Sequence, residues 1–337
     1  MFAMNRILLA LRRACIGAAA CAGIACAIVW LTPAVLAQSY PTRPVTIIVP
    51  TTPAGITDNI ARVVAQKLSE QMGQPFIVEN RPGANGNIAA EAVAKAPADG
   101  YRLLIGTIGV MSINPYIYKQ VGYDPLKDFT AVAQLVSFSN ILVVNPSVAA
   151  TSVAELIAYA KANPGKLSYS SSGSGGSPHM AMALFAKMAD IDIVHIPYKG
   201  SAPAITDLIS GQVQLSFGDP IATLPQVKSG KLRALGVSGN KRLASAPEIP
   251  TIAEAGLPGY VVSGWIGLVA PAGTPPAIVS ALNSEVRRAL ADPPIREKLL
   301  AAAADPAAGT VAEFQQYIAA ENQRWSKLVK DAGITAE

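Results

Sequence analysis

The sequence predicts an α/β protein built as two lobes. Short β-branched runs, typical of buried strands, alternate with segments whose apolar residues recur at helical spacing. This alternation occurs in two successive blocks, and about 300 residues follow residue 37, more than one domain usually holds. Strands separated by helices of this length need crossover connections, so we expect parallel sheets that are covered on both faces.

The first block opens with residues 44–50, a β-branched run bounded by prolines that predicts a buried strand. Apolar side chains at helical spacing predict a helix over residues 59–72. The pattern then predicts a strand at 76–79, a helix at 87–94 and a strand at 101–106.

The second block begins with a strand at residues 141–144. A helix over 152–162 follows, capped by Ser152 with Glu155 three residues later. The tail from residue 275 onward is predicted to be helical. The rest of the block predicts strands at 167–170, 193–197, 213–217 and 232–237, and helices at 178–188, 203–209 and 221–229.

The N-terminus has the pattern of an export signal. Three arginines, Arg6, Arg12 and Arg13, precede an apolar run over residues 14–31, and small residues lead up to Ala37. This order predicts a signal peptide over residues 1–37, cleaved after Ala37, and hence a periplasmic protein. An uncleaved membrane anchor is the alternative, and the pattern leaves open whether export is general or twin-arginine.

Cleavage changes what the composition permits. All three cysteines, Cys15, Cys21 and Cys26, lie in the predicted signal peptide, so we expect no disulfide and no thiolate site in the mature chain. Basic residues fall from 27 to 24 while acidic residues stay at 22, which leaves a net charge of +2. No basic cluster with interleaved aromatic residues remains, so nucleic acid is not an expected partner.

Three loops between a predicted strand and a predicted helix have the composition of ligand-binding loops. Ligands of open α/β sheets bind at the carboxyl ends of strands, beside helix N-termini whose free amides attract anions. The expected ligand-binding residues in the first loop are Thr51, Ala54, Gly55, Thr57 and Asp58. Those in the second are Thr107 and Gly109, and those in the third are Ser172, Gly173, Ser174, Gly175, Ser177 and His179. Asp219, which follows the strand at 213–217, is expected either to contact the far end of the ligand or to cap the next helix.

Catalytic and metal-binding patterns are not found. The glycine-rich stretch departs from G-x-S-x-G because Ser172 stands at the first position before Ser174. The only histidines, His179 and His195, belong to different predicted elements, so we expect no metal site, no cofactor and no catalytic residue. His195 is interpreted as a strand-end residue with a satisfied ring. A hydrolase that uses Ser174 and His179 is the enzyme alternative.

Five segments carry a family resemblance: residues 78–87 (VENRPGANGN), 99–101 (DGY), 195–203 (HIPYKGSAP), 230–235 (GKLRAL) and 254–260 (EAGLPGY). In this order and spacing they resemble the Bug family, the extracytoplasmic receptors of tripartite tricarboxylate transporters. The resemblance covers nearly all of the predicted mature chain.

The resemblance implies a two-lobed periplasmic-binding-protein fold of type II, with a ligand cleft between the lobes. Lobe 1 would comprise residues 38–138 plus 263–337 and lobe 2 residues 139–262, with crossovers near Phe138 and Trp265. The family's first loop usually reads P-F-P-P-G-G-x-T-D. Here Thr51 replaces the aromatic residue and Ala54 replaces the first glycine.

The resemblance also implies a function. Backbone amides and hydroxyls of the lobe 1 loops, with ordered water, would hold a ligand carboxylate. The expected protein is a monomeric periplasmic solute-binding protein that captures a small carboxylate, either a dicarboxylate or an aromatic carboxylate, for the permease subunits of such a transporter. The alternatives are a receptor for an amino acid or amide, with Asp219 meeting the donor, and a sensory binding protein. The sequence does not identify the carboxylate.

Overall fold

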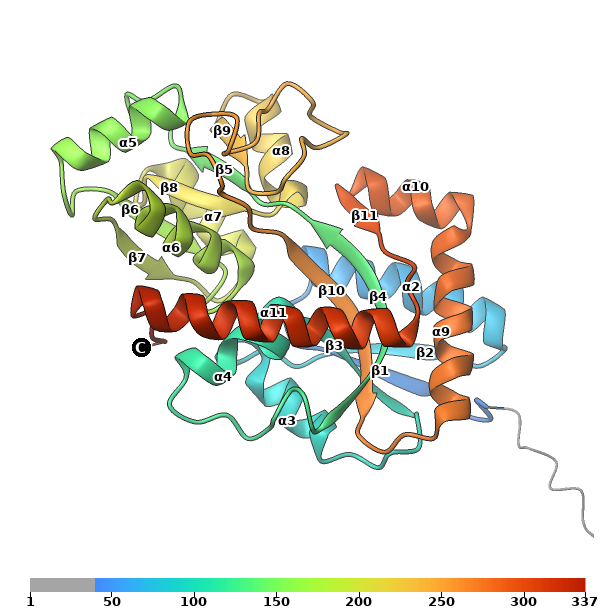
Figure 1. The fold of residues 1–337 in the computed structure, drawn as a ribbon. Helices are drawn as coiled ribbons and strands as arrows, with labels where there is room; N and C mark the ends of the chain where they lie inside the picture. Colours follow the sequence, from blue (N-terminus) through green and yellow to red (C-terminus); the bar gives the residue numbers. More distant parts are fainter. Residues whose placement is uncertain (1–39, 337) are drawn as a thin grey trace, which may run out of the picture. The chain divides into compact units, whose positions relative to one another are not determined.

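The structure, a computed structural model, describes residues 40–336 (Figure 1). The predicted signal peptide, its cleavage site and the three cysteines lie outside the described residues. Of the described residues, 43–336 belong to one compact unit. Within the described part of the chain, no helix is both long and apolar enough to span a membrane.

Six strands form the first sheet, in the order β11-β4-β10-β3-β1-β2. β1 pairs in parallel with β2 and β3, whereas β10 runs antiparallel to both β3 and β4. The strands are β1 (Val45–Val49), β2 (Phe76–Asn80), β3 (Arg102–Thr107), β4 (Phe129–Phe138), β10 (Gly264–Pro271) and β11 (Ala304–Pro306).

Five strands form the second sheet, in the order β7-β6-β8-β5-β9. β6 is parallel to β7 and β8, and β5 is antiparallel to β8 and β9. The strands are β5 (Ile141–Val144), β6 (Ser168–Ser171), β7 (Val194–Pro197), β8 (Leu215–Gly218) and β9 (Arg233–Val237).

The expectation of purely parallel sheets is wrong, because both sheets are mixed. The antiparallel strands lie where the chain changes sheet. β4 ends at Phe138 in the first sheet, and only two residues separate it from β5 in the second. No helix returns the chain to the starting edge of a sheet there, so no parallel crossover forms. The chain rejoins the first sheet through β10. The strands at 129–138, 264–271 and 304–306 were not predicted, and the last of them interrupts the tail that was expected to be helical.

The predicted helices are present, with ends shifted by a few residues. The helix expected over 59–72 starts earlier, at Ile56, and Ser152 caps its helix as expected, its side chain accepting a hydrogen bond from the Glu155 amide. The helices are α2 (Ile56–Met72), α3 (Asn87–Ala94), α4 (Asn114–Ile117), α5 (Val153–Ala162), α6 (Ser177–Ala189), α7 (Ser201–Ser210), α8 (Pro220–Lys228), α9 (Pro276–Ala291), α10 (Pro293–Ala301) and α11 (Val311–Ala332), with short turns η1 (Ala84–Gly86) and η2 (Gly109–Ile113).

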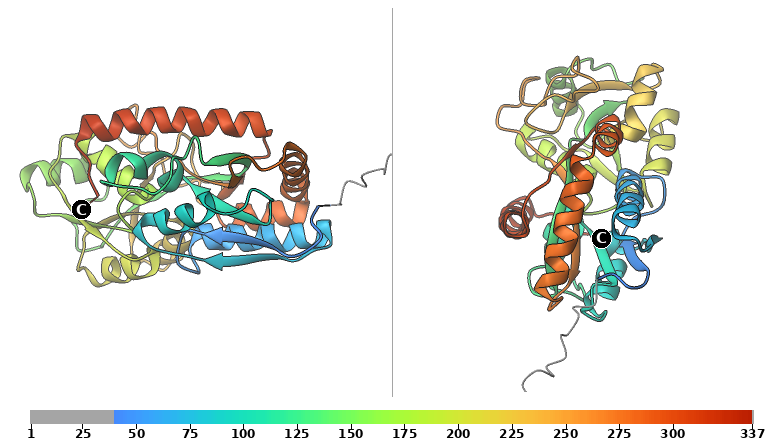
Figure 2. Two further views of the ribbon diagram at one scale, coloured as in Figure 1. Left: turned by 90° about the horizontal axis from the view of Figure 1, so that it is seen from below. Right: turned by 90° about the vertical axis from the view of Figure 1, so that its right-hand side faces the viewer.

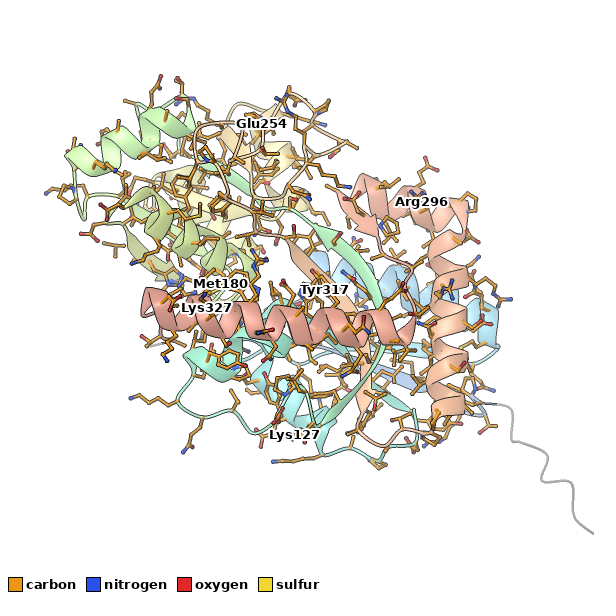
Figure 3. The ribbon with its side chains drawn as sticks, viewed as in Figure 1. Lys127, Met180, Glu254, Arg296, Tyr317 and Lys327 are labelled. Atoms are coloured by element: carbon orange, nitrogen blue, oxygen red, sulfur yellow. The ribbon has the colours of Figure 1, made fainter. Side chains whose placement is uncertain are left out.

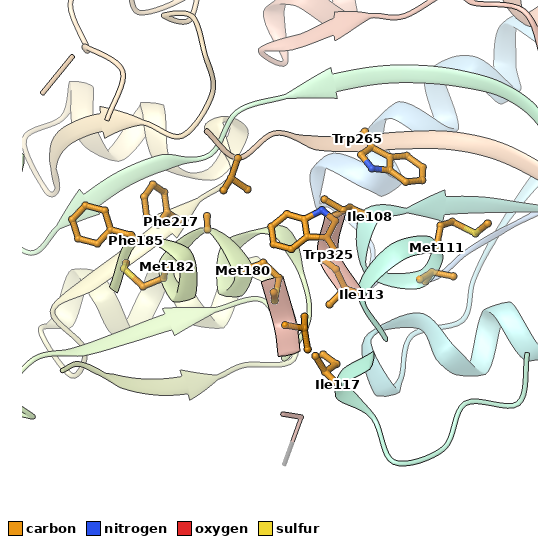
Figure 4. Packing of buried hydrophobic residues seen from close by; sticks show 14 of the residues in the cluster. Ile108, Met111, Ile113, Ile117, Met180, Met182, Phe185, Phe217, Trp265 and Trp325 are labelled. Atoms are coloured by element: carbon orange, nitrogen blue, oxygen red, sulfur yellow. The ribbon is translucent and has the colours of Figure 1, made fainter. Parts of the chain in front are cut away.

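The C-terminal helix α11 runs past both sheets (Figures 1 and 2). Its Phe314 and Tyr317 pack edge-on against the ring of Trp265 in β10, and Tyr317 is labelled in Figure 3. Towards its other end, Trp325 is fully buried and belongs to the same apolar cluster as Met180 of α6 (Figure 4). One continuous apolar core therefore joins the second sheet's α6 layer to the first sheet through α11.

Candidate ligand-binding site

A cavity of about 570 Å³ lies where loops of the two sheets meet. The first sheet contributes the loops that follow β1, β2 and β3, and the second sheet contributes those that follow β6, β7 and β8. Each of these loops leaves the carboxyl end of its strand, which is the location the α/β rule predicts. The volume is that of a small-molecule site.

Most of the predicted ligand-binding residues meet at this cavity, and four do not. Its wall includes Thr51, Gly55, Thr57, Thr107, Gly109, Ser172, Gly173, Ser174, Ser177 and Asp219. Ala54, Asp58, Gly175 and His179 are not among the lining residues. Ala54 and Gly175 lie in loops that line the cavity. Asp58 and His179 lie in the first turns of the helices and accept hydrogen bonds from the amides of Ala54 and Gly175.

The cavity also has lining residues that the sequence analysis did not select. Thr52 and Asn85 come from the first-sheet loops, Tyr198 and Lys199 come from the loop between β7 and α7, and Ser201 is the first residue of α7. Asn85 and residues 198–201 lie in segments that carried the family resemblance. The same strand-to-helix rule, applied to the strand at 193–197, would have selected the second group.

Asp58 supports the first loop from behind. Its Oδ2 accepts a hydrogen bond from the Ala54 amide at 3.0 Å, and its Oδ1 accepts one from Asn80 Nδ2 at 2.9 Å. Arg62 forms an ion pair with the same carboxylate at 3.0 Å. Burial raises the pKa of Asp58, but the hydrogen bonds from Arg62, Asn80 and Ala54 outweigh it and lower that pKa below its usual value. Asp58 therefore stays ionised and holds the turn in which Ala54 adopts a left-handed φ of 71°.

Four helices point their N-termini at the cavity without a capping side chain. The N-cap residues of α2, α6, α7 and α8 are Gly55, Gly176, Gly200 and Asp219; all four line the cavity, and none makes a side-chain capping hydrogen bond. By contrast, α5 and α11 start elsewhere and are capped by hydroxyl groups. The free amides of a helix's first turn, together with its dipole, favour an anion. The N-termini of α2 on one side and of α6 and α7 on the other can thus receive negative charge, whereas at α8 Pro220 has no N–H and the Ala222 amide bonds to the Asp219 carbonyl.

A stacked pair of histidines supports the glycine-rich loop of the second sheet. The rings of His179 and His195 lie 4.0 Å apart and 7° from parallel. His179 Nδ1 accepts a hydrogen bond from the Gly175 amide at 3.0 Å, and His195 Nε2 lies 2.7 Å from Ser171 Oγ. Burial lowers the pKa of His179 to about 3 and that of His195 to about 4, so both rings are neutral at neutral pH.

This pairing revises one step of the sequence analysis. The sequence predicted that His179 and His195 belong to different elements. They do come from α6 and β7, but the fold stacks their rings together. Within residues 40–336, no group of three or more His, Cys, Asp or Glu side chains is placed to hold a metal ion. His179 uses its Nδ1 to hold the loop amide of Gly175, and Ser174 lines the cavity. His195 has a partner for its ring, as expected.

Loops from the two sheets approach each other closely around the cavity. The Tyr118 hydroxyl, which belongs to the first-sheet half, donates to the Ser174 carbonyl at 3.2 Å. A Cβ placed on Gly109 would lie 3.1 Å from the carbonyl oxygen of Gly175, and one on Gly200 would lie 2.7 Å from Thr52 Oγ1. The glycines at 109 and 200 therefore leave room for these approaches, and at Gly200 a φ of 115° also favours glycine.

The architecture and the comparisons with known proteins agree. Two mixed α/β sheets with a cavity between their carboxyl-end loops define the periplasmic-binding-protein fold. Residues 60–334 match the model of the tripartite tricarboxylate transporter family receptor, TctC. The chain belongs to this family of solute receptors, whose members are binding proteins rather than enzymes.

Among curated proteins, the chain is 37% identical over 312 residues to Protein BugT of Bordetella pertussis, covering 92% of this chain and 96% of that protein. It is 38% identical over 300 residues to a protein from the tcbD-tcbE intergenic region of Pseudomonas sp. strain P51, covering 89% of each chain.

Two solved structures from Rhodopseudomonas palustris contain ligands. Rpa4515 with adipate has a TM-score of 0.84 and 43% identity, covering 88% of this chain and 99% of that one. MatC with bound malate has a TM-score of 0.81 and 32% identity, covering 86% of this chain and 100% of that one. The periplasmic binding protein BugD is also similar, with a TM-score of 0.82 and 33% identity over 88% of this chain and 100% of its own.

Proposed function

We propose that this chain is a periplasmic receptor that captures a small dicarboxylate and delivers it to the membrane permease of a tripartite tricarboxylate transporter. The observation that carries the proposal is the set of four helix N-termini without capping side chains, which open on one cavity from both sheets. Each charge-assisted hydrogen bond to a carboxylate contributes about 1.5–3 kcal/mol. Two groups of such donors on opposite walls suit a ligand with a carboxylate at each end.

The relatives support the dicarboxylate rather than the aromatic carboxylate. Adipate and malate, the ligands named for two similar structures, are both dicarboxylates. In this chain Thr51, which lines the cavity, stands where the family pattern usually has an aromatic residue. Without an aromatic ring at that position, the cavity lacks the flat apolar wall on which an aromatic ligand would stack.

In this proposal each of the two sheets forms the centre of one lobe. Residues 38–138 plus 263–337 would form lobe 1 and residues 139–262 lobe 2, and closure of the lobes would bury the ligand. A ligand shifts such an equilibrium by its preference for the closed state. Export with cleavage after Ala37, and a monomeric receptor, complete the proposal.

A second candidate rests on Asp219. This carboxyl group lines the cavity and is 7% exposed, so it could accept a hydrogen bond from the ammonium or amide of an amino-acid or amide ligand. Substitution of Asp219 by Asn separates the two candidates. An amino-acid ligand should lose much of its affinity, whereas a dicarboxylate should bind as well or better.

The test of the main proposal is a ligand panel on the purified mature chain. Mono-, di- and tricarboxylates, amino acids and amides are screened by the shift in thermal unfolding, and the hits are measured by calorimetry. We expect dicarboxylates to give the largest shifts. Tight binding of amino acids with no response to any dicarboxylate would overturn the proposal, and turnover of a bound ligand that Ser174→Ala abolishes would point to a hydrolase instead.

A further inference from the structure

Asp219 is a buried carboxyl group in the cavity wall with one hydrogen-bonding side-chain partner. It is the N-cap residue of α8, and its Oδ2 accepts a hydrogen bond of 2.6 Å from Ser201 Oγ in the first turn of α7. None of the ion pairs among residues 40–336 includes Asp219. Burial raises the pKa of Asp219, and the hydrogen bond from Ser201 lowers it less than burial raises it. A carboxyl group in this setting takes up a proton readily when a second negative charge comes close.

The charged and titratable groups around Asp219 leave it without a paired cation. On the loop before α7, Lys199 lines the cavity but is exposed to solvent. On α7 itself, Asp207 accepts a hydrogen bond from Tyr198 Oη at 2.7 Å, and that tyrosine also lines the cavity. Tyr118, on the opposite wall, donates to the Ser174 carbonyl. Neither β8 nor the first turn of α8 contains another titratable residue, and Lys228 lies in the last turn of α8.

The second carboxylate of a dicarboxylate would lie next to Asp219. The open N-terminus of α7, at Gly200 and Ser201, is one anion seat on this wall. Because Ser201 Oγ donates to Asp219 Oδ2 at 2.6 Å, a carboxylate bound to these amides would be a neighbour of the Asp219 carboxyl group. Two neighbouring carboxylates in a buried site do not both stay ionised, and the pair retains one proton.

We propose that Asp219 and the second carboxyl group of a bound dicarboxylate share one proton, so that this receptor takes up a proton from solution when it captures a diacid. The proposal rests on the proposed function and adds a chemical rule for its ligands. The group at the far end of the ligand must either share a proton with Asp219 or bring a hydrogen-bond donor of its own. A diacid does the first, and the matching monoamide does the second without any proton uptake.

Proton uptake changes only the protonation of the two carboxyl groups. Solvent or buffer supplies one proton, which stays between an oxygen of Asp219 and an oxygen of the ligand, while Ser201 continues to donate to Asp219 Oδ2. No bond to carbon changes. Between the pKa of the free groups and the higher pKa of the proton shared in the complex, one linked proton weakens the apparent affinity about tenfold for each unit by which pH rises.

Calorimetry in buffers of different ionisation enthalpy measures the proton uptake directly. The ligands are succinate, glutarate and adipate, each paired with its monoamide, titrated into the mature protein between pH 6.5 and 8.5. We expect uptake of roughly one proton for each diacid that binds, with affinity falling as pH rises, and no uptake for the monoamides. In Asp219→Asn the diacids should bind without uptake and with an affinity that no longer depends on pH.

The matched control is Asp192→Asn, which changes an exposed carboxyl group of the same half outside the cavity and should behave as wild type. Ser201→Ala is a second variant in case Asp219→Asn folds poorly. It removes a hydrogen bond that lowers the pKa of Asp219, so uptake should persist and extend to higher pH. Diacid binding without proton uptake in the wild type, or unchanged uptake in Asp219→Asn, would overturn the inference and leave the proposed function standing. A complete lack of diacid binding would overturn both.

Discussion

At the scale of single residues, the cavity separates side chains that face the ligand from side chains that hold the loops. Thr57 belongs to the first group, since it lines the cavity and is only 8% exposed. Asp58, one residue later, belongs to the second, because its carboxylate is used by Ala54, Asn80 and Arg62. Two adjacent polar residues in one helical turn therefore have different roles, and burial alone does not distinguish them.

Thr57→Val should weaken dicarboxylate binding without unfolding the chain. The substitution keeps the shape and removes one hydroxyl donor to a charged group, which is worth about 1.5–3 kcal/mol, or roughly ten- to hundredfold in Kd. Calorimetry on the wild type and the variant measures the change. Thr206→Val is the control, since Thr206 is exposed on α7 and bonds only to the Ala202 carbonyl in its own helix. Equal affinities for Thr57→Val and wild type would remove Thr57 from the site.

The stacked histidines predict a loss of stability in acid. Their pKa values in the folded chain, about 3 and about 4, lie below the unperturbed value near 6.5, so between these limits the unfolded chain binds protons that the folded chain does not. Stability should therefore be constant above about pH 7 and fall as pH drops towards 4.

Thermal unfolding between pH 8 and 4.5 checks whether stability falls in acid, and a variant without the two histidines shows how much of the fall they cause. The double substitution His179→Phe and His195→Phe keeps the stacking and removes both titrations, so its unfolding temperature should fall less steeply with acid than that of wild type. Parallel pH profiles for the two proteins would show that other groups cause the acid loss.

At the scale of elements, the way each helix begins distinguishes binding helices from structural ones. α11 begins with a complete capping box between Thr310 and Glu313, and α5 begins with Ser152. The helices that open on the cavity begin with Gly55, Gly176 and Gly200, or with Asp219, and leave their amides without capping side chains. An anion would satisfy those amides, at the cost of lower helix stability while the cavity holds none.

Gly55→Asp tests directly whether capping α2 prevents its first-turn amides from binding the ligand. Gly55 has an extended backbone, with φ −80° and ψ 172°, and a Cβ there would meet no atom within 4 Å, so the aspartate fits. Its carboxylate should cap α2, raise the free energy of unfolding by a few tenths of a kcal/mol, and compete with the ligand for the same amides. We expect dicarboxylate binding to be lost by calorimetry.

Gly55→Asn is the neutral control, because it caps the helix with almost the same shape but without the negative charge. It should weaken binding less than the aspartate does. If Gly55→Asp bound dicarboxylates with wild-type affinity, the N-terminus of α2 would not be a carboxylate seat.

At the scale of the whole folded unit, contacts between the loops of the first sheet and those of the second limit how the cavity can open. Thr52 from the first sheet's loop faces Gly200 from the second, and Tyr118 reaches the Ser174 carbonyl. α11 packs on the first sheet through Phe314, and its Arg324 donates to the Val261 carbonyl at 2.7 Å, just before β10. Any opening of the cavity has to separate these contacts while β4, β10 and α11 stay continuous.

Thr52→Trp should hold the two loop sets apart. The indole occupies the space opposite Gly200, so the closed arrangement becomes unfavourable and the apparent Kd rises as the inverse of the closed fraction that remains. Small-angle scattering should show compaction on addition of dicarboxylate for wild type and for Thr52→Ala, and little change for Thr52→Trp. Identical scattering profiles with and without ligand in the wild type would contradict closure.

The sequence predicts single strands, caps and loops better than it predicts how the strands are arranged in the sheets. Local signals predicted the strand of residues 45–49, the cap of Ser152 and the polar strand ends and helix starts that include Thr57, Thr107 and Ser174, because strand composition, capping and polarity are properties of short segments. The mixed direction of the sheets was not predictable in this way, since it depends on how far a chain travels before it pairs again.

What the sequence determined by itself is the class of the protein: alternating strands and helices, polar loops at strand ends, and the segments shared with a receptor family. Tertiary structure alone decided which polar residues meet. It placed Asp58 behind its loop, stacked His179 on His195, and brought Ser201 to Asp219 across 18 positions of the chain. The physical reason is that a residue's local propensity depends on its neighbours in the chain, whereas its burial, hydrogen-bonding partners and protonation depend on groups that only folding brings close.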